Sequence, residues 1–165
     1  GMELADADLF TGRQVVLTPI KPTLRPNVQR AAQVWTSLGA RVSQMTHQAH
    51  DSAFAAVSHL PHLLAFAYMN GIASQPEGET FLELAGPGFR DFTRIAAGEP
   101  TLWRDVLLAN REQVLRQSQH FRHALDELET MMRTGNVTDL EQAITQASQV
   151  RGEWRLNSGT ESPDA

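Results

Sequence analysis

The sequence predicts a mainly α protein in which a helical domain follows a short strand–helix–strand segment. Apolar residues recur at helical spacing almost throughout after residue 45, whereas short β-branched runs and turn residues mark the stretch before it. A chain of 165 residues is long enough for one domain and part of another. We therefore divide the sequence into residues 1–45, residues 46–156 and a tail at 157–165, whose composition predicts disorder.

The first part alternates a strand, a helix and a strand. Residues 13–18 form a β-branched apolar run that Pro19 ends, which predicts a buried strand. Helical spacing follows over residues 26–38, with Gly39 as its stop, and residues 40–45 predict a second strand. Two strands and one helix cannot cover the edges and faces of a sheet. This part is therefore either a small α+β cap or the end of a larger sheet.

The second part predicts helices. They are expected over residues 46–70, 88–97, 103–132 and 138–155, and a short helix or turn is expected over residues 78–86. Thr46 is the expected cap of the first helix, Gly71 its stop, and Gly135 the stop of the long fourth helix. The last two helices carry more apolar side chains than one small bundle can bury. We therefore expect a twofold homodimer.

Composition argues against several classes of function. The net charge of −5 and the absence of a basic block argue against a nucleic-acid partner. The absence of cysteine excludes disulfides, zinc–thiolate sites and thiol nucleophiles, and it fits the cytoplasm. The longest apolar stretch is far shorter than the roughly 20 residues that span a bilayer, and no secretory signal opens the sequence, so we expect no membrane partner. Neither a G-x-G-x-x-G fingerprint nor a P-loop is present.

A first candidate site lies in residues 46–67, which hold four of the six histidines. Ser58 and His62 are four residues apart and so share one face of a helix. Pro61 lacks an N–H and should kink the helix there, which frees a backbone carbonyl beside both residues. This pattern suits a ligand that meets the helix. The alternative is that His62 is a partly buried histidine with a purely structural partner.

The adjacent pair His50-Asp51 suggests a different chemistry, that of a metal-dependent phosphohydrolase. Such a site needs further His and Asp ligands, for which His120, His123 and Asp126 are available. A two-residue signal of this kind arises often by chance, so we expect no metal.

A second candidate site lies in residues 86–96, where a Gly-rich entry precedes two arginines. Arg90 and Arg94 lie four residues apart, and Asp91 stands between them. Arginines at the start of a helix concentrate positive charge and N–H donors, which suits an anionic ligand and especially a dicarboxylate. The alternative is a surface Arg–Asp ion pair without a function.

Several segments share their order and spacing with one enzyme family: His50-Asp51, Ser58-His59-Leu60-Pro61-His62, Gly88 to Ala96, Trp103-Arg104-Asp105 and Asn110. Together they resemble the prephenate and arogenate dehydrogenases of tyrosine biosynthesis, and the similarity covers residues 4–155. The resemblance implies that residues 1–45 are the remnant of a Rossmann-type nucleotide-binding domain. It implies that residues 46–156 form a helical dimerisation and substrate-binding domain.

The resemblance also implies roles for single residues. Arg94 is expected to bind a substrate carboxylate, and the pocket is expected to include His62, Ser58 and Trp103. Arg90 stands where many relatives have lysine. Asp91 is expected to reach the neighbouring subunit's site.

The family resemblance places NAD or NADP and the catalytic histidine mainly in a portion that these residues do not contain. We therefore assign no catalytic residue here and expect this chain alone to be inactive. The implied substrate is prephenate or arogenate, and tyrosine is a candidate inhibitor. The alternative function is a stand-alone helical dimeric module that binds or regulates without catalysis.

Overall fold

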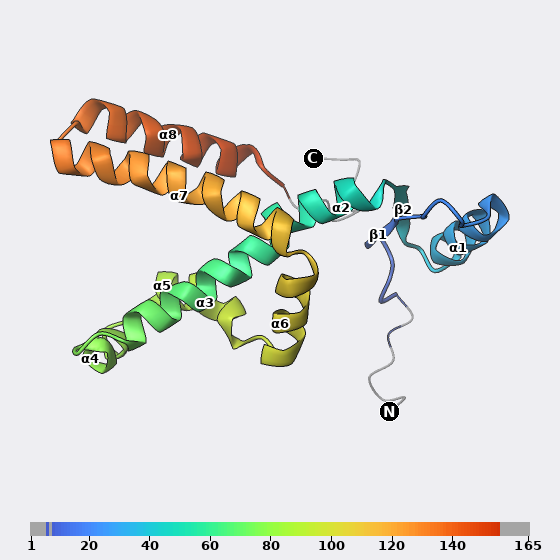
Figure 1. Cartoon of the computed structure of the whole chain (residues 1–165), viewed down its shortest axis with the longest axis horizontal. Helices are drawn as coiled ribbons and strands as arrows, with labels where there is room; N and C mark the ends of the chain where they lie inside the picture. The colour runs from blue at the N-terminus through green and yellow to red at the C-terminus, as the bar shows by residue number, and fades with distance from the viewer. Residues whose placement is uncertain (1–5, 7, 156–165) are drawn as a thin grey trace. The chain divides into compact units, whose positions relative to one another are not determined.

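The computed structural model describes residue 6 and residues 8–155 (Figure 1). The chain divides into two compact units, one of residues 1–50 with 134–165 and one of residues 51–133. The predicted fold class, a mainly α chain after a strand–helix–strand segment, is confirmed. The tail predicted to be disordered, 157–165, lies outside the described residues. No helix of the described part is both long and apolar enough to cross a membrane.

The three predicted elements of the first part are present: β1 (Gln14–Leu17), α1 (Arg25–Ser37) and β2 (Arg41–Gln44). The strands pair in parallel, from Gln14 opposite Arg41 to Leu17 opposite Gln44. A parallel pair requires a crossover, which α1 supplies. Gly39 turns the chain from α1 into β2 at a φ of 83°, a value that glycine adopts without strain. This segment is therefore a single βαβ unit.

The first predicted long helix is three consecutive segments: α2 (His47–Phe54), the π-helix η2 (Ala55–His59) and α3 (Leu60–Ala73). Thr46 caps α2 as expected, because the Ala49 N–H donates to its hydroxyl over 3.2 Å. The wide π turn ends at His59, two residues before Pro61, the residue predicted to disturb the helix. The predicted stop at Gly71 was wrong, since α3 continues to Ala73. Gly71 has open space around it and no backbone reason to end the helix.

Short helices pack along α3: α4 (Gly78–Glu83), α5 (Pro87–Thr93) and the 3₁₀ turn η3 (Arg94–Ala97) (Figure 1). The Tyr68 ring on α3 contacts two rings of α5, with centroid distances of 5.8 Å to Phe89 and 5.4 Å to Phe92. Aromatic pairs of this geometry fix one element against another. They hold α5, and with it the start of η3, beside α3.

The continuous helix predicted over residues 103–132 was wrong. The structure has two helices there, α6 (Pro100–Ala109) and α7 (Arg111–Thr134), separated at Asn110 with φ −110° and ψ 26°. The predicted stop at Gly135 is confirmed by its φ of 64°. Asn136 then caps α8 (Val137–Glu153) by accepting the Asp139 N–H over 3.2 Å.

Few apolar side chains of residues 8–155 are buried. Those that are buried are mostly small: Ala40, Ala55, Leu60, Ala65 and Val114. No large side chain of the described residues is fully buried. By contrast, large apolar residues of the last three helices remain exposed: Leu102, Leu108, Leu115, Phe121, Leu125, Met132, Val137, Ile144 and Val150. A chain of this length normally covers more of its apolar surface.

Candidate functional site

An aromatic cluster joins α3 to α6 within the unit of residues 51–133. The imidazole of His62 stacks on the indole of Trp103, with ring centroids 3.4 Å apart and an interplanar angle of 20°. Phe66, one turn after His62, lies edge-on to the indole at 6.4 Å. All three side chains are half-buried, so the cluster is partly accessible to solvent.

Ser58 contacts His62 through its backbone. The Ser58 carbonyl lies in the π turn η2, 2.9 Å from the Nδ1 atom of His62. Because a carbonyl oxygen only accepts hydrogen bonds, Nδ1 must carry the proton in this contact. The predicted shared helix face of Ser58 and His62 is therefore present, and the atom of Ser58 that contacts the imidazole is its backbone carbonyl oxygen. In neutral His62 the lone pair lies on Nε2.

The turn between η3 and α6 is shaped around Trp103. A Cβ atom added at Gly98 would lie 2.5 Å from the indole Nε1 and 2.7 Å from Cδ1, closer than real side chains approach. Next in sequence, Glu99 caps α6 by accepting the Leu102 N–H over 2.5 Å. The N–H groups of Leu102 and Thr101 hold the pKa of the Glu99 carboxyl below its usual value. Glu99 thus fixes the start of α6, and Gly98 leaves room for the indole of Trp103. Neither residue was selected from the sequence.

The two arginines of the second candidate site differ in their surroundings. Arg90 pairs with Asp91 at 3.2 Å, and the side chains are 75% and 70% exposed. A pair so open to water contributes little to stability. Arg94 begins η3, which packs against α3, and is exposed. Among the described residues it has no ion-pair partner, so its guanidinium is available to an anionic ligand.

Asn110 forms a third feature of this unit. Its side-chain Nδ2 lies 2.7 Å from the carbonyl oxygen of Asp51 and 3.2 Å from Nδ1 of His59. His59 in turn lies edge-on to Trp103, with ring centroids 6.5 Å apart. The sequence analysis placed Asn110 within a family pattern and within a predicted helix, and gave it no role of its own. The signal that was available is an asparagine, a weak helix former, inside an otherwise helical run.

The histidine-rich segment does not assemble a metal site in the structure. Within the residues that the structure describes, no three His, Asp or Glu side chains come together as a ligand set. Asp51 instead uses its backbone carbonyl to accept from Asn110. The pair His50-Asp51 therefore gives no structural support for a metal-dependent phosphohydrolase.

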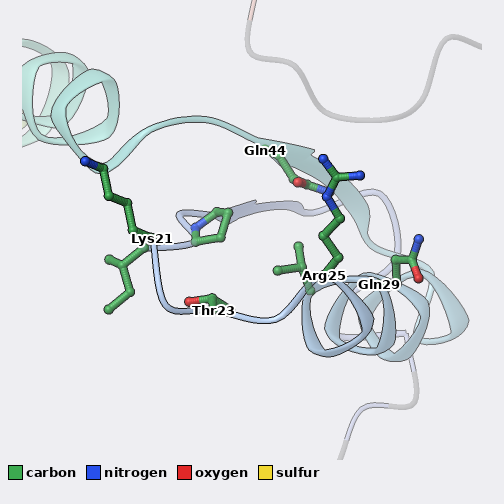
Figure 2. Close-up of a pocket in the computed structure, with 8 residues that line it drawn as sticks. Lys21, Thr23, Arg25, Gln29 and Gln44 are labelled. Atoms are coloured by element: carbon green, nitrogen blue, oxygen red, sulfur yellow. The ribbon is translucent and has the colours of Figure 1, made fainter.

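A separate open pocket of about 440 Å³ lies at the carboxyl ends of β1 and β2. It is lined by Pro19, Ile20, Lys21, Thr23, Arg25, Val28, Gln29 and Gln44. Figure 2 shows that Arg25 extends toward Gln44, whereas Lys21 points away on the other side of the pocket. The two cations do not converge on one point. Since the sequence also lacks a dinucleotide fingerprint, these residues do not fit a complete nicotinamide dinucleotide site.

Residues 46–146 match the family model described as prephenate dehydrogenase, dimerization domain. A cyclohexadienyl dehydrogenase from Zymomonas mobilis is 35% identical over 133 residues, which is 79% of this chain and 45% of that protein. The crystal structure of prephenate dehydrogenase from A. aeolicus in complex with hydroxyphenyl propionate and NAD+ matches 93% of this chain and 54% of that one. Its TM-score is 0.84 and its identity 35%.

A crystal structure of Synechocystis arogenate dehydrogenase is also similar. It matches 90% of this chain and 54% of that chain, with a TM-score of 0.80 and 28% identity. The chain thus spans about half the length of the relatives it matches.

Proposed function

Because this chain belongs to the prephenate dehydrogenase family, we propose that it is the dimerisation and substrate-binding part of an enzyme of tyrosine biosynthesis. The reaction is the NAD(P)-dependent oxidative decarboxylation of prephenate or arogenate in the cytoplasm. In this proposal residues 46–156 form the dimerisation and substrate-binding domain, and residues 1–45 complete a nucleotide-binding domain. NAD or NADP is held mainly by polypeptide outside these 165 residues.

The observation that carries the proposal is the ligand of the A. aeolicus relative, hydroxyphenyl propionate, which combines an aromatic ring with a carboxylate. This chain offers a group for each. The stacked rings of His62 and Trp103 form a half-buried flat surface, and Arg94 has an exposed guanidinium without an ion-pair partner among the described residues. A guanidinium binds a carboxylate through two parallel hydrogen bonds and so fixes the orientation of the attached ring.

We propose the following roles for the single residues. Arg94 binds a substrate carboxylate, and His62 and Trp103 contact the ring. Ser58 fixes the imidazole of His62, while Arg90 and Asp91 contribute charge at the edge of the site, Asp91 toward the partner subunit. Tyrosine has the same ring and carboxylate, so we also propose it as an inhibitor that competes for these groups. Titration of tyrosine into the full-length enzyme by calorimetry, with and without a substrate analogue, tests this competition.

A first test concerns the chain by itself. We expect the 165-residue chain to show no NAD(P)-dependent oxidation of prephenate or arogenate, because it lacks the dinucleotide fingerprint and an assigned catalytic base. The measurement is reduced nicotinamide absorbance with each substrate and each cofactor, beside the full-length enzyme as a positive control. Turnover by the chain alone would show that the reacting groups lie within it.

A second test concerns the dimer. Phe121, Leu125 and Met132 share one stripe of α7 and are 38%, 42% and 67% exposed. Stable obligate interfaces commonly bury more than about 2,000 Å², and this stripe is apolar surface that a partner subunit would cover. Light scattering at micromolar concentration should therefore give the mass of two chains.

Substitutions on opposite faces of α7 sharpen this test. Leu125→Glu places a charge in the stripe and should shift the mass toward one chain. Arg116 lies nine residues before Leu125, on the opposite face of α7, so Arg116→Glu should leave the dimer intact. A wild-type monomer, or equal effects of the two substitutions, would contradict the proposed interface.

A further inference from the structure

The side chain of Asn110 connects three segments that are far apart in the sequence. It stands at the break between α6 and α7, and its Nδ2 donates to the Asp51 carbonyl over 2.7 Å. The same nitrogen lies 3.2 Å from Nδ1 of His59 in the π turn. An amide carries two N–H groups on this nitrogen, one for each contact. The reversed amide would place its oxygen against the Asp51 carbonyl, an acceptor facing an acceptor.

These contacts fix the tautomers of two histidines in opposite senses. Because the Asn110 nitrogen only donates, Nδ1 of His59 must accept, and neutral His59 carries its proton on Nε2. His62 is the reverse, since its Nδ1 donates to the Ser58 carbonyl over 2.9 Å. Both rings contact the same indole: His62 stacks on Trp103 at 3.4 Å, and His59 meets it edge-on at 6.5 Å.

We propose that Asn110 is a positioning residue that fixes the tautomer and orientation of His59 and, through it, the Trp103–His62 stack. The functional part rests on the proposed function, in which this stack contacts the substrate ring. Asn110 does not itself meet the substrate. It ties the start of α7 to the backbone of α2, and it holds the His59 ring in the one orientation that satisfies the amide. Trp103 then contacts two oriented imidazole rings, His59 in a T-shaped pair and His62 in a stack.

This role explains why the helix breaks where it does. An asparagine in a regular helix points its side chain to solvent or to its own backbone. Asn110 instead adopts a non-helical φ of −110°. Its side-chain amide contacts Asp51 and His59, which lie more than 50 positions earlier in the chain. The helix is therefore interrupted at Asn110, and the half-buried amide of this residue makes two long-range hydrogen bonds.

The first arm of the test needs no substrate. Long-range ¹H–¹⁵N spectra of imidazole rings distinguish the two tautomers, and His59→Gln identifies the His59 signals by their loss. In the full-length protein at neutral pH we expect His59 in the Nε2–H form and His62 in the Nδ1–H form. Asn110→Asp presents an acceptor to Nδ1 and should move the proton of His59 to that nitrogen, with His62 unchanged. His59 as the Nδ1–H form in the wild type, or as the Nε2–H form in Asn110→Asp, would overturn the proposal.

The second arm measures kinetics. Asn110→Ala should raise KM for the substrate about tenfold, the ratio that corresponds to losing one hydrogen bond near the site. Asn70→Ala makes the same change at an exposed position of α3 and should leave KM unchanged. A lowered melting temperature with unaltered KM in Asn110→Ala would reduce Asn110 to a structural residue and overturn its positioning role.

The two arms fail separately. An enzyme that turns over neither prephenate nor arogenate would refute the proposed function, while the tautomers of His59 and His62 would still decide the role of Asn110.

Discussion

Replacing Arg94 with alanine in the full-length enzyme should raise KM by a factor of about 30 to 1,000 and leave the fold intact. This corresponds to a loss of about 2–4 kcal/mol, typical for removing one partner of a desolvated charged pair. The reason lies in the contrast between the two arginines of this segment. Arg90 is paired with Asp91 at 3.2 Å, whereas Arg94 has no ion-pair partner among the described residues. Steady-state kinetics with each substrate, beside a thermal unfolding curve, measure both effects.

Two further variants give this prediction its controls. Arg94→Lys keeps the charge but loses the planar guanidinium, so its KM should lie between those of the wild type and Arg94→Ala. Arg116→Ala removes an exposed arginine from the face of α7 opposite its apolar stripe, and KM should not change. An unaltered KM and kcat in Arg94→Ala would mean that Arg94 is a surface residue that does not bind substrate. The main support for the proposed carboxylate site would then be lost.

Local signals in the sequence predicted most of the fold. Residues 13–18 were predicted as a strand because a β-branched run ends at Pro19, and residues 40–45 as a second short strand after Gly39; both strands are present. Gly39 and Gly135 ended helices because the chain needs a positive φ there, and the structure has 83° and 64°. Such signals act within a few residues, so they can be found without knowledge of the tertiary contacts.

The two wrong helix boundaries show the limit of this reasoning. Gly71 looked like a stop, but a glycine in a helix interior costs only about 1 kcal/mol, which the packing of α3 offsets. Asn110 looked like one more helical residue, yet its amide is engaged by Asp51 and His59. The break at Asn110 depends on partners more than 50 positions away. No periodicity over a short window contains that information.

The sequence predicted which residues belong to the candidate site better than it predicted how they contact one another. The helix-face argument brought Ser58 and His62 together, and the structure has them in contact, through the carbonyl of Ser58. The stack of Trp103 on His62 joins side chains 41 positions apart in the sequence, and local spacing does not predict such a contact. Whether these residues bind a substrate stays a prediction, as do the roles of Arg90, Asp91 and Arg94.

Gly98→Ala should destabilise the protein by about 1–3 kcal/mol and weaken substrate binding, because no space exists for the added methyl group. Gly98 has φ −65° and ψ 158°, a backbone conformation that any residue adopts. The need for glycine is therefore steric. The new Cβ would lie 2.5 Å from Nε1 of Trp103, and the indole cannot retreat easily because His62 stacks on its ring at 3.4 Å. Relief of the clash requires the indole to leave the stack or α6 to shift.

Gly71→Ala supplies the matched control, because it is the same substitution at an exposed helical glycine with nothing within 4 Å. It should stabilise the protein by about 0.5–1 kcal/mol, the difference in helix propensity between alanine and glycine. Thermal unfolding of both variants measures the opposite signs, and KM measures the second consequence, a rise in Gly98→Ala alone. Trp103 fluorescence, isolated by Trp35→Phe and Trp154→Phe, should change in Gly98→Ala if the indole leaves its stack on His62. Equal stability of the two alanine variants would mean that the indole of Trp103 moves aside without a loss of folding free energy. The indole would then be too mobile to position a substrate ring.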